Sequence, residues 1–137
     1  MRRYALDACA LIALLQNEQG AEIVSDAFNA AYRGEAEIII HKANLLEVYY
    51  DAYHYRGREQ ADLMVVEIKK RPIQINSEIT DDIFTEAGRL KATYRISFAD
   101  SFALAQAKIF DGALLTSDHH EFDLVENSED IEFAWIR

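Results

Sequence analysis

The chain has 137 residues, of which half are hydrophobic and only six are glycine or proline, so it is long enough for one packed domain and too apolar to be disordered. Its formal net charge of −10 argues against a protein that coats nucleic acid by bulk positive charge. It does not exclude a nuclease, because a bound cation can supply positive charge locally. The single cysteine, Cys9, rules out a disulfide within the chain and favours a reducing compartment. We expect Cys9 to be a small buried apolar residue.

The first residues have some features of a targeting segment. Arg2 and Arg3 precede an apolar stretch, but Asp7 interrupts it and no small-residue cleavage site follows. The uninterrupted apolar part, residues 8–15, is too short to cross a bilayer. We therefore expect a cytoplasmic protein with no membrane contact that forms a single domain over residues 1–137.

Five short apolar stretches are predicted to be strands. The run over residues 37–41 is β-branched and shows no polar alternation, which is typical of a parallel sheet covered on both faces. Pro72 opens another stretch and favours a sheet edge, because proline cannot donate a ladder hydrogen bond. The predicted strands cover residues 4–6, 37–41, 72–75, 112–116 and 131–136.

Most of the sequence between these strands has helical periodicity. The predicted helices cover residues 8–15, 21–32, 44–56, 58–70 and 81–95, and another begins after Ser97. The leucines and tyrosines of residues 45–55 occupy more than one helical face. By default we expect them in the core, and the alternative is that some of them form an interface with another protein. Residues 119–130 are polar and acidic, and we expect a loop at His119 and His120. The alternation of strands and helices predicts an α/β fold around a mostly parallel sheet.

The helix after Ser97 carries the most unusual pattern in the chain. Ser97 is a good N-cap, and Asp100 lies three residues later, as in a capping box. Apolar residues cover nearly every face of the segment that follows, which predicts a buried helix. A carboxylate at the head of a buried helix is costly unless a cation meets it.

Four acidic residues are expected at one rim of the sheet. Ligands bind beyond the carboxyl ends of strands in open parallel sheets, and Asp7, Glu47, Asp100 and Asp118 follow such ends or begin the next helix. Helix capping, including an Asn44–Glu47 pair, or a turn at Asp118 would explain each acid separately. Together, four carboxylates would repel one another. Mg²⁺ or Mn²⁺ would relieve this repulsion, since hard cations prefer oxygen ligands.

Four segments, in order, resemble the PIN-domain family, and most closely its VapC-type toxins of prokaryotic toxin–antitoxin pairs. They are DACAL at residues 7–11, NLLEV at 44–48, SFADSFALA at 97–105 and LTSDHHEF at 115–122. The resemblance spans residues 4 to about 122. It implies a Rossmann-like α/β/α sandwich and metal-dependent endoribonuclease activity that cleaves RNA phosphodiester bonds with metal-activated water.

The family's catalytic acids match Asp7, Glu47, Asp100 and Asp118 in this chain. The resemblance implies that they bind one or two Mg²⁺ or Mn²⁺ ions, with Glu47 either a ligand or a group that orients water. It also implies a homodimer and a cognate antitoxin protein that covers the active site. Cys9 departs from the hydroxyl residue that relatives often hold at its position, and we give it no catalytic role.

Several further residues are candidates for supporting roles. Asn44 could hydrogen-bond a catalytic carboxylate or simply cap its helix. Thr116 and Ser117 could orient a metal ligand or a phosphate oxygen, or only complete strand-end hydrogen bonds. Four basic residues are candidate RNA contacts, with a solvated helix face as the alternative: Lys42, Arg89, Lys91 and Arg95.

Two other classes of protein share parts of this pattern. A phosphoacceptor receiver domain would have paired acids after its first strand and a lysine after its last, whereas this chain has only Asp7 and ends Ala-Trp-Ile-Arg. A catalytically inactive PIN-fold binding module would not need all four acids. The possibility that a nuclease of this fold acts on DNA stays open, because no residue in the sequence is identifiable as a contact to the 2′-hydroxyl of RNA.

Overall fold

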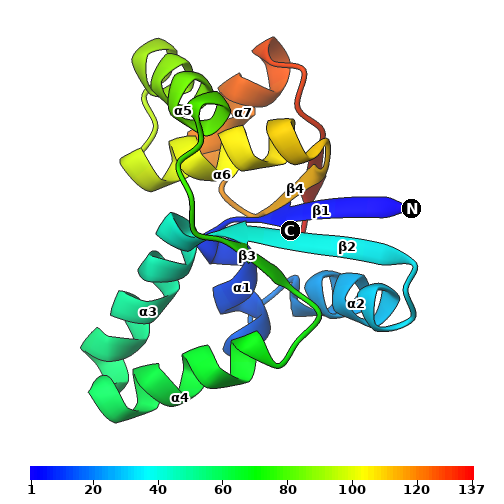
Figure 1. The fold of residues 1–137 in the computed structure, drawn as a ribbon, viewed down its shortest axis with the longest axis vertical. Helices are drawn as coiled ribbons and strands as arrows, with labels where there is room; N and C mark the ends of the chain where they lie inside the picture. Colours follow the sequence, from blue (N-terminus) through cyan, green and yellow to red (C-terminus); the bar gives the residue numbers. More distant parts are fainter.

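A computed structural model describes residues 1–137 and has one five-stranded sheet with helices on both faces (Figure 1). The strand order is β3-β2-β1-β4-β5, and every neighbouring pair is parallel. The strands are β1 (Arg2–Leu6), β2 (Ala36–His41), β3 (Gln74–Asn76), β4 (Ala113–Thr116) and β5 (Phe133–Trp135). The α/β sandwich predicted from the sequence is therefore confirmed, with an entirely parallel sheet and β3 at an edge.

Seven helices connect the strands and form the two outer layers (Figure 1). They are α1 (Ala8–Leu15), α2 (Ala21–Tyr32), α3 (Lys42–Arg56), α4 (Arg58–Lys69), α5 (Asp81–Thr93), α6 (Phe98–Phe110) and α7 (His119–Ser128). Helices α5, α6 and α7 lie on one face of the sheet, and α1 to α4 lie on the other. No helix is both long enough and apolar enough to span a bilayer.

Alternate residues of the central strands feed two separate cores. Ala5 and Leu114 pack with α5, α6 and α7, whereas Leu6 and Leu115 pack with α1 to α4. This alternation is what the two-residue side-chain period of a strand requires when both faces are covered. It also explains why the strand sequences are continuously apolar.

The acidic segment after Asp118 forms helix α7, so the expected loop at residues 119 and 120 was wrong. Phe122 and Val125 are the buried residues of α7, and their spacing of three places both on its inner face. Asp118 caps the helix by accepting a hydrogen bond from the Glu121 N–H (3.2 Å). Acidic residues on the other faces hid this short amphipathic pattern.

Two expectations about burial were also wrong, and a third holds only in part. Cys9 is exposed, because it lies on the open side of the first turn of α1. Phe98 is 71% exposed on the otherwise mostly buried α6. On α3, Leu46 and Tyr50 are 58% and 57% exposed, so the apolar side chains there are not all core and the interface alternative gains support.

Candidate functional site

The carboxyl ends of three adjacent strands bring the predicted acids to one edge of the sheet. Leu6 of β1 is in register with Ile40 of β2 and with Leu115 of β4, so the three strands end at nearly the same level. Asp7 directly follows β1, and Asp118 follows β4 after one intervening residue. Helix α3 begins directly after β2 and carries Glu47 in its second turn.

Asp7 is the most buried of the four acids, with 2% of its surface exposed. It is the N-cap of α1, and its Oδ1 accepts a hydrogen bond from the Ala10 N–H (2.9 Å). Its Oδ2 accepts a short hydrogen bond from the Thr116 hydroxyl. The predicted capping role is real, and it fixes the direction of a carboxylate at the sheet edge.

Thr116 connects two of the acids. Its fully buried hydroxyl donates to Asp7, and the same oxygen accepts the Asp118 N–H (3.1 Å). Strand-end hydrogen bonding and orientation of an acidic side chain are therefore one arrangement rather than alternatives. Ser117 is half-buried, and its backbone carbonyl accepts the His119 N–H (3.0 Å).

Asp100 occupies the third helical position of α6 in a capping box. The Ser97 hydroxyl accepts the Asp100 N–H (3.1 Å), and Asp100 Oδ2 accepts the Ser97 N–H (3.4 Å). Asp100 is 9% exposed. Since Asp7 and Asp118 cap α1 and α7, the positive ends of three helix dipoles meet this group of acids.

Asn44 joins the helix of Glu47 to the helix of Asp100. Its fully buried side chain donates from Nδ2 to the Ala99 carbonyl (2.9 Å), while its Oδ1 has no hydrogen-bond partner. The expected alternative of Asn44 as N-cap is wrong, because His41 caps α3 through Nδ1 (3.0 Å from the Ala43 nitrogen). Asn44 therefore fixes α3 against the start of α6, one turn before the half-buried Glu47.

Burial and mutual repulsion raise the pKa of three of these carboxyl groups. Burial raises the pKa of Asp7 from 3.8 to about 7, against the effect of the Thr116 and Ala10 hydrogen bonds, and Asp100 and Asp118 raise it further. Burial raises the pKa of Asp100 to about 6. The pKa of Glu47 is also raised, first by burial and then by Asp100.

The thiol of Cys9 lies within the electrostatic influence of all four acids. Although part of Cys9 is exposed, the protein around its thiol disfavours the thiolate by desolvation; this effect first, and then the charges of Asp7, Asp118, Asp100 and Glu47, raise the pKa of the thiol to about 12. The thiol is therefore a poor nucleophile at neutral pH. The only signal in the sequence for placing Cys9 near these acids is its position two residues after Asp7.

The donor set is suited to a hydrated hard cation. None of the four acids takes part in a salt bridge, so their negative charge has no protein counterion. No three His, Cys, Asp or Glu side chains are arranged as a group that could hold a metal ion as they stand. Mg²⁺ typically keeps several waters and takes only one or two carboxylates directly, so the chemistry of the donors fits, although a closed site is not preformed.

The predicted basic residues do not all remain free. Arg89 donates to both Glu86 and Glu129, with a distance of 2.6 Å to the Glu129 carboxylate. Its predicted role as an RNA contact is therefore unsupported, because its charge joins α5 to the end of α7. Lys42, Lys91 and Arg95 are exposed and form no salt bridge.

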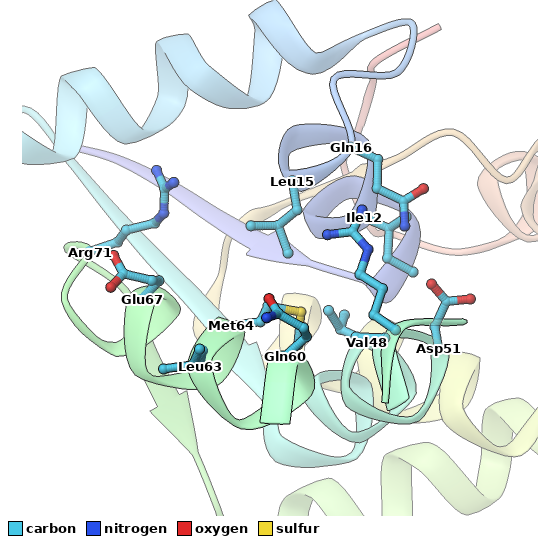
Figure 2. A pocket seen from close by; sticks show the side chains of 12 residues that line it. Ile12, Leu15, Gln16, Val48, Asp51, Gln60, Leu63, Met64, Glu67 and Arg71 are labelled. Carbon is cyan, nitrogen blue, oxygen red and sulfur yellow. The ribbon is translucent and has the colours of Figure 1, made fainter. Parts of the chain in front are cut away.

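A groove of about 340 Å³ lies between α1, α3 and α4 (Figure 2). Ile12, Val48 and Met64 contribute apolar surface, while Asp51 and Arg71 lie at its sides. Helix α1 is capped by Asp7, and helix α3 carries Glu47. The groove is thus a mixed apolar and charged surface along two helices of the acidic site.

The chain belongs to the PIN domain family, whose sequence model matches residues 4–127. Its fold is similar to VapBC-1 from nontypeable Haemophilus influenzae, at 18% identity over 98% of both chains with a TM-score of 0.74. VapBC2 from Rickettsia felis, solved with a DNA fragment from its promoter, has 16% identity over 97% of this chain and 98% of that chain, with a TM-score of 0.75.

A third similar structure is the Mycobacterium tuberculosis toxin VapC20, described as cleaving the Sarcin-Ricin loop. It has 12% identity over 80% of this chain and 84% of that chain, with a TM-score of 0.59. At these identities the structures establish the fold. No curated protein sequence matches the chain.

Proposed function

We propose that the chain is a metal-dependent endoribonuclease that acts as the toxin of a VapBC-type toxin–antitoxin pair. The observation that carries this proposal is the placement of four carboxylates at the carboxyl ends of adjacent parallel strands or at the helix starts beside them, with no salt-bridge partner for any of the four. Membership of the PIN family and the similarity to VapBC structures support the same function. The cytoplasm, with RNA as substrate, is the compartment that this function requires.

In this proposal Asp7, Asp100 and Asp118 hold Mg²⁺ or Mn²⁺, and Glu47 either completes the site or orients water. The cation supplies a Lewis acid for the phosphate and lowers the pKa of water. Thr116 holds the Asp7 carboxylate in place through its hydroxyl. The Ser97 N–H does the same for Asp100. Burial disfavours the ionised forms of Asp7 and Asp100. Both carboxyl groups would therefore release their protons when a cation binds.

Two partners belong to this proposal. A cognate antitoxin is supported by the similarity to VapBC complexes, and the groove of Figure 2 lies along the helices that such a protein would need to approach. A homodimer is proposed from the family alone. The exposed side chain of Tyr50 on α3 offers contact surface for either partner.

Cleavage of a labelled structured RNA by the purified chain, with Mg²⁺, Mn²⁺ or EDTA, tests the proposal. Asp100→Asn removes one charge while keeping a side-chain oxygen that can accept the Ser97 N–H of the capping box. Asp82→Asn is the matched control, because Asp82 is an exposed acid in the first turn of α5. We expect metal-dependent cleavage by the parent and by Asp82→Asn only.

The main alternative is a PIN-fold binding module without catalysis. It predicts no cleavage by a folded, partner-free sample and no stabilisation by Mn²⁺. Equal cleavage by the parent and Asp100→Asn would place the activity outside the four acids. Each of these results would contradict the proposed function.

A further inference from the structure

A second groove, of about 410 Å³, lies between α3, α4 and the end of β3. Its eight lining residues include two lysines and no acid, in a chain that has 24 acidic and 14 basic residues. The lysines are Lys42, at the start of α3, and Lys69, at the end of α4. Neither forms a salt bridge, so both charges are available to an anionic ligand.

One end of the groove lies at the same edge of the sheet as the four acids. Lys42 directly follows β2, and Ser77 directly follows β3, so both mark the carboxyl ends of their strands. Helix α3 connects the two features, because Lys42 lines the groove and Glu47 belongs to the acidic site. Five residues of α-helix separate them by about 7.5 Å along the helix axis and about 140° around it, so an RNA strand that contacts both must pass around the start of α3.

The remaining wall of the groove is apolar and aromatic. Leu46 is 58% exposed there. The Tyr49 hydroxyl donates to Asp62 of α4 (2.6 Å), which holds the Tyr49 ring between the two helices. Fixed aromatic and apolar surface beside unpaired cations is the combination with which proteins bind single-stranded nucleic acid.

We propose that this groove binds the RNA strand on one side of the scissile phosphate, with Lys42 and Lys69 contacting phosphates and Tyr49 contacting a base or ribose. The inference rests on the proposed nuclease function and adds a path for its substrate. It also assigns an RNA contact to Lys69, which was not among the basic residues that the sequence indicated as candidates. It also explains how an acidic chain receives RNA, since Arg89 is neutralised by two glutamates.

The test compares two double variants that lose the same charge. Lys42→Gln with Lys69→Gln empties the groove of cations. Arg33→Gln with Lys70→Gln is the control, because these side chains are paired with Glu35 and Glu67 (3.1 Å each) outside the groove. Fluorescence anisotropy with a labelled 12-nucleotide single-stranded RNA in EDTA measures binding without hydrolysis.

Counterion release gives the expected size of the effect. Loss of two phosphate contacts should weaken RNA binding about tenfold at low salt and reduce the slope of log K against log salt by about 1.4, since each contact to a single strand contributes about 0.7. The control pair should bind within about twofold of the parent. In Mg²⁺, the groove pair should raise KM for RNA cleavage and leave kcat unchanged.

Ultraviolet crosslinking of 4-thiouridine RNA to the unmodified chain provides a second measurement that needs no variant. Crosslinked peptides should come from α3 and the end of α4. Crosslinks confined to α5 and α6, or equal RNA affinity of the groove pair and the parent, would overturn the groove while leaving the nuclease intact. A parent that neither binds nor cleaves RNA would overturn both the proposed function and this inference.

Discussion

Asp7 should destabilise the metal-free fold at neutral pH, so Asp7→Asn should make the protein more stable. The carboxyl is 2% exposed, has no cationic partner, and its pKa rises from 3.8 to about 7 on folding. The folded state therefore holds this proton more tightly than the unfolded chain does. Stability from this group is greatest below the unfolded pKa, falls as pH rises towards 7, and is constant above it.

The magnitude follows from the pKa values. Each pH unit between the unfolded and folded pKa corresponds to about 1.4 kcal/mol, so ionised Asp7 lowers the free energy of unfolding by about 4 kcal/mol at pH 8. About 2 kcal/mol of this loss falls between pH 5.5 and pH 8. Asparagine carries no charge and can still accept the Ala10 N–H, but its amide nitrogen cannot accept the Thr116 hydroxyl, which costs about 1 kcal/mol. Asp7→Asn should therefore gain about 2–4 kcal/mol at pH 8. For a domain of this size that is about 6–12 °C in Tm.

Urea denaturation in EDTA at pH 5.5, 6.5 and 8 measures this directly. The parent should lose stability across the series, whereas Asp7→Asn should change much less and exceed the parent most at pH 8. Asp26→Asn, at an exposed position of α2, is the control and should follow the parent. A parent whose stability does not fall between pH 5.5 and 8, or an Asp7→Asn protein less stable than the parent at pH 8, would refute the reasoning.

Three further outcomes are expected. Mn²⁺ at 100 times its dissociation constant should stabilise the parent protein by about 2.7 kcal/mol and leave the stability of Asp7→Asn nearly unchanged. Differential scanning fluorimetry measures both, and equal Tm shifts of the parent and Asp7→Asn would contradict this expectation. Thr116→Val should lower the free energy of unfolding by about 1–3 kcal/mol, because it leaves the Asp118 N–H unpaired. It should also raise the pKa of Asp7, so the pH midpoint of RNA cleavage should move upward. An unchanged midpoint would show that Thr116 does not act on the site. Arg89→Met should lower stability by about 1 kcal/mol through loss of its pairing with Glu129 while leaving KM for RNA unchanged, and a raised KM would restore Arg89 as an RNA contact.

The parts of the fold that follow from local pattern were predictable from the sequence. The β-branched run at residues 37–41 and the Ser97 capping box appear in the structure as expected, at β2 and the start of α6. Their signals are local, since strand burial requires continuous apolar residues and capping requires one hydroxyl at one position. Pro72 correctly indicated an edge, because β3 has a neighbour on one side only.

The parts that depend on tertiary packing were not predictable in this way. Helix α7 buries only Phe122 and Val125, so its apolar face is too narrow to stand out in an acidic segment. Phe98 and Cys9 have apolar character but lie on faces that no other element covers. The sequence near Phe98 or Cys9 gives no indication that its side chain is exposed.

The candidate site shows the same division between local and long-range information. Strand ends placed Asp7 and Asp118 at one edge, and helix starts placed Asp100 and Glu47 near it. The contacts that hold them, from Thr116 to Asp7 and from Asn44 to the Ala99 carbonyl, span 109 and 55 residues of sequence. A single sequence indicates such residue types as candidates and does not specify which pairs meet.

The most direct test of the account is the chemical identity of the RNA ends that the chain produces in Mg²⁺. Attack by water at a site built from the four acids predicts a 5′-phosphate and a 3′-hydroxyl, no product in EDTA, and none from Asp100→Asn. Labelled RNA with end-specific enzymatic treatment and mass spectrometry distinguishes these products. A 2′,3′-cyclic phosphate with a 5′-hydroxyl, formed equally in EDTA, would show that the RNA's own 2′-hydroxyl attacks without metal and would contradict the account.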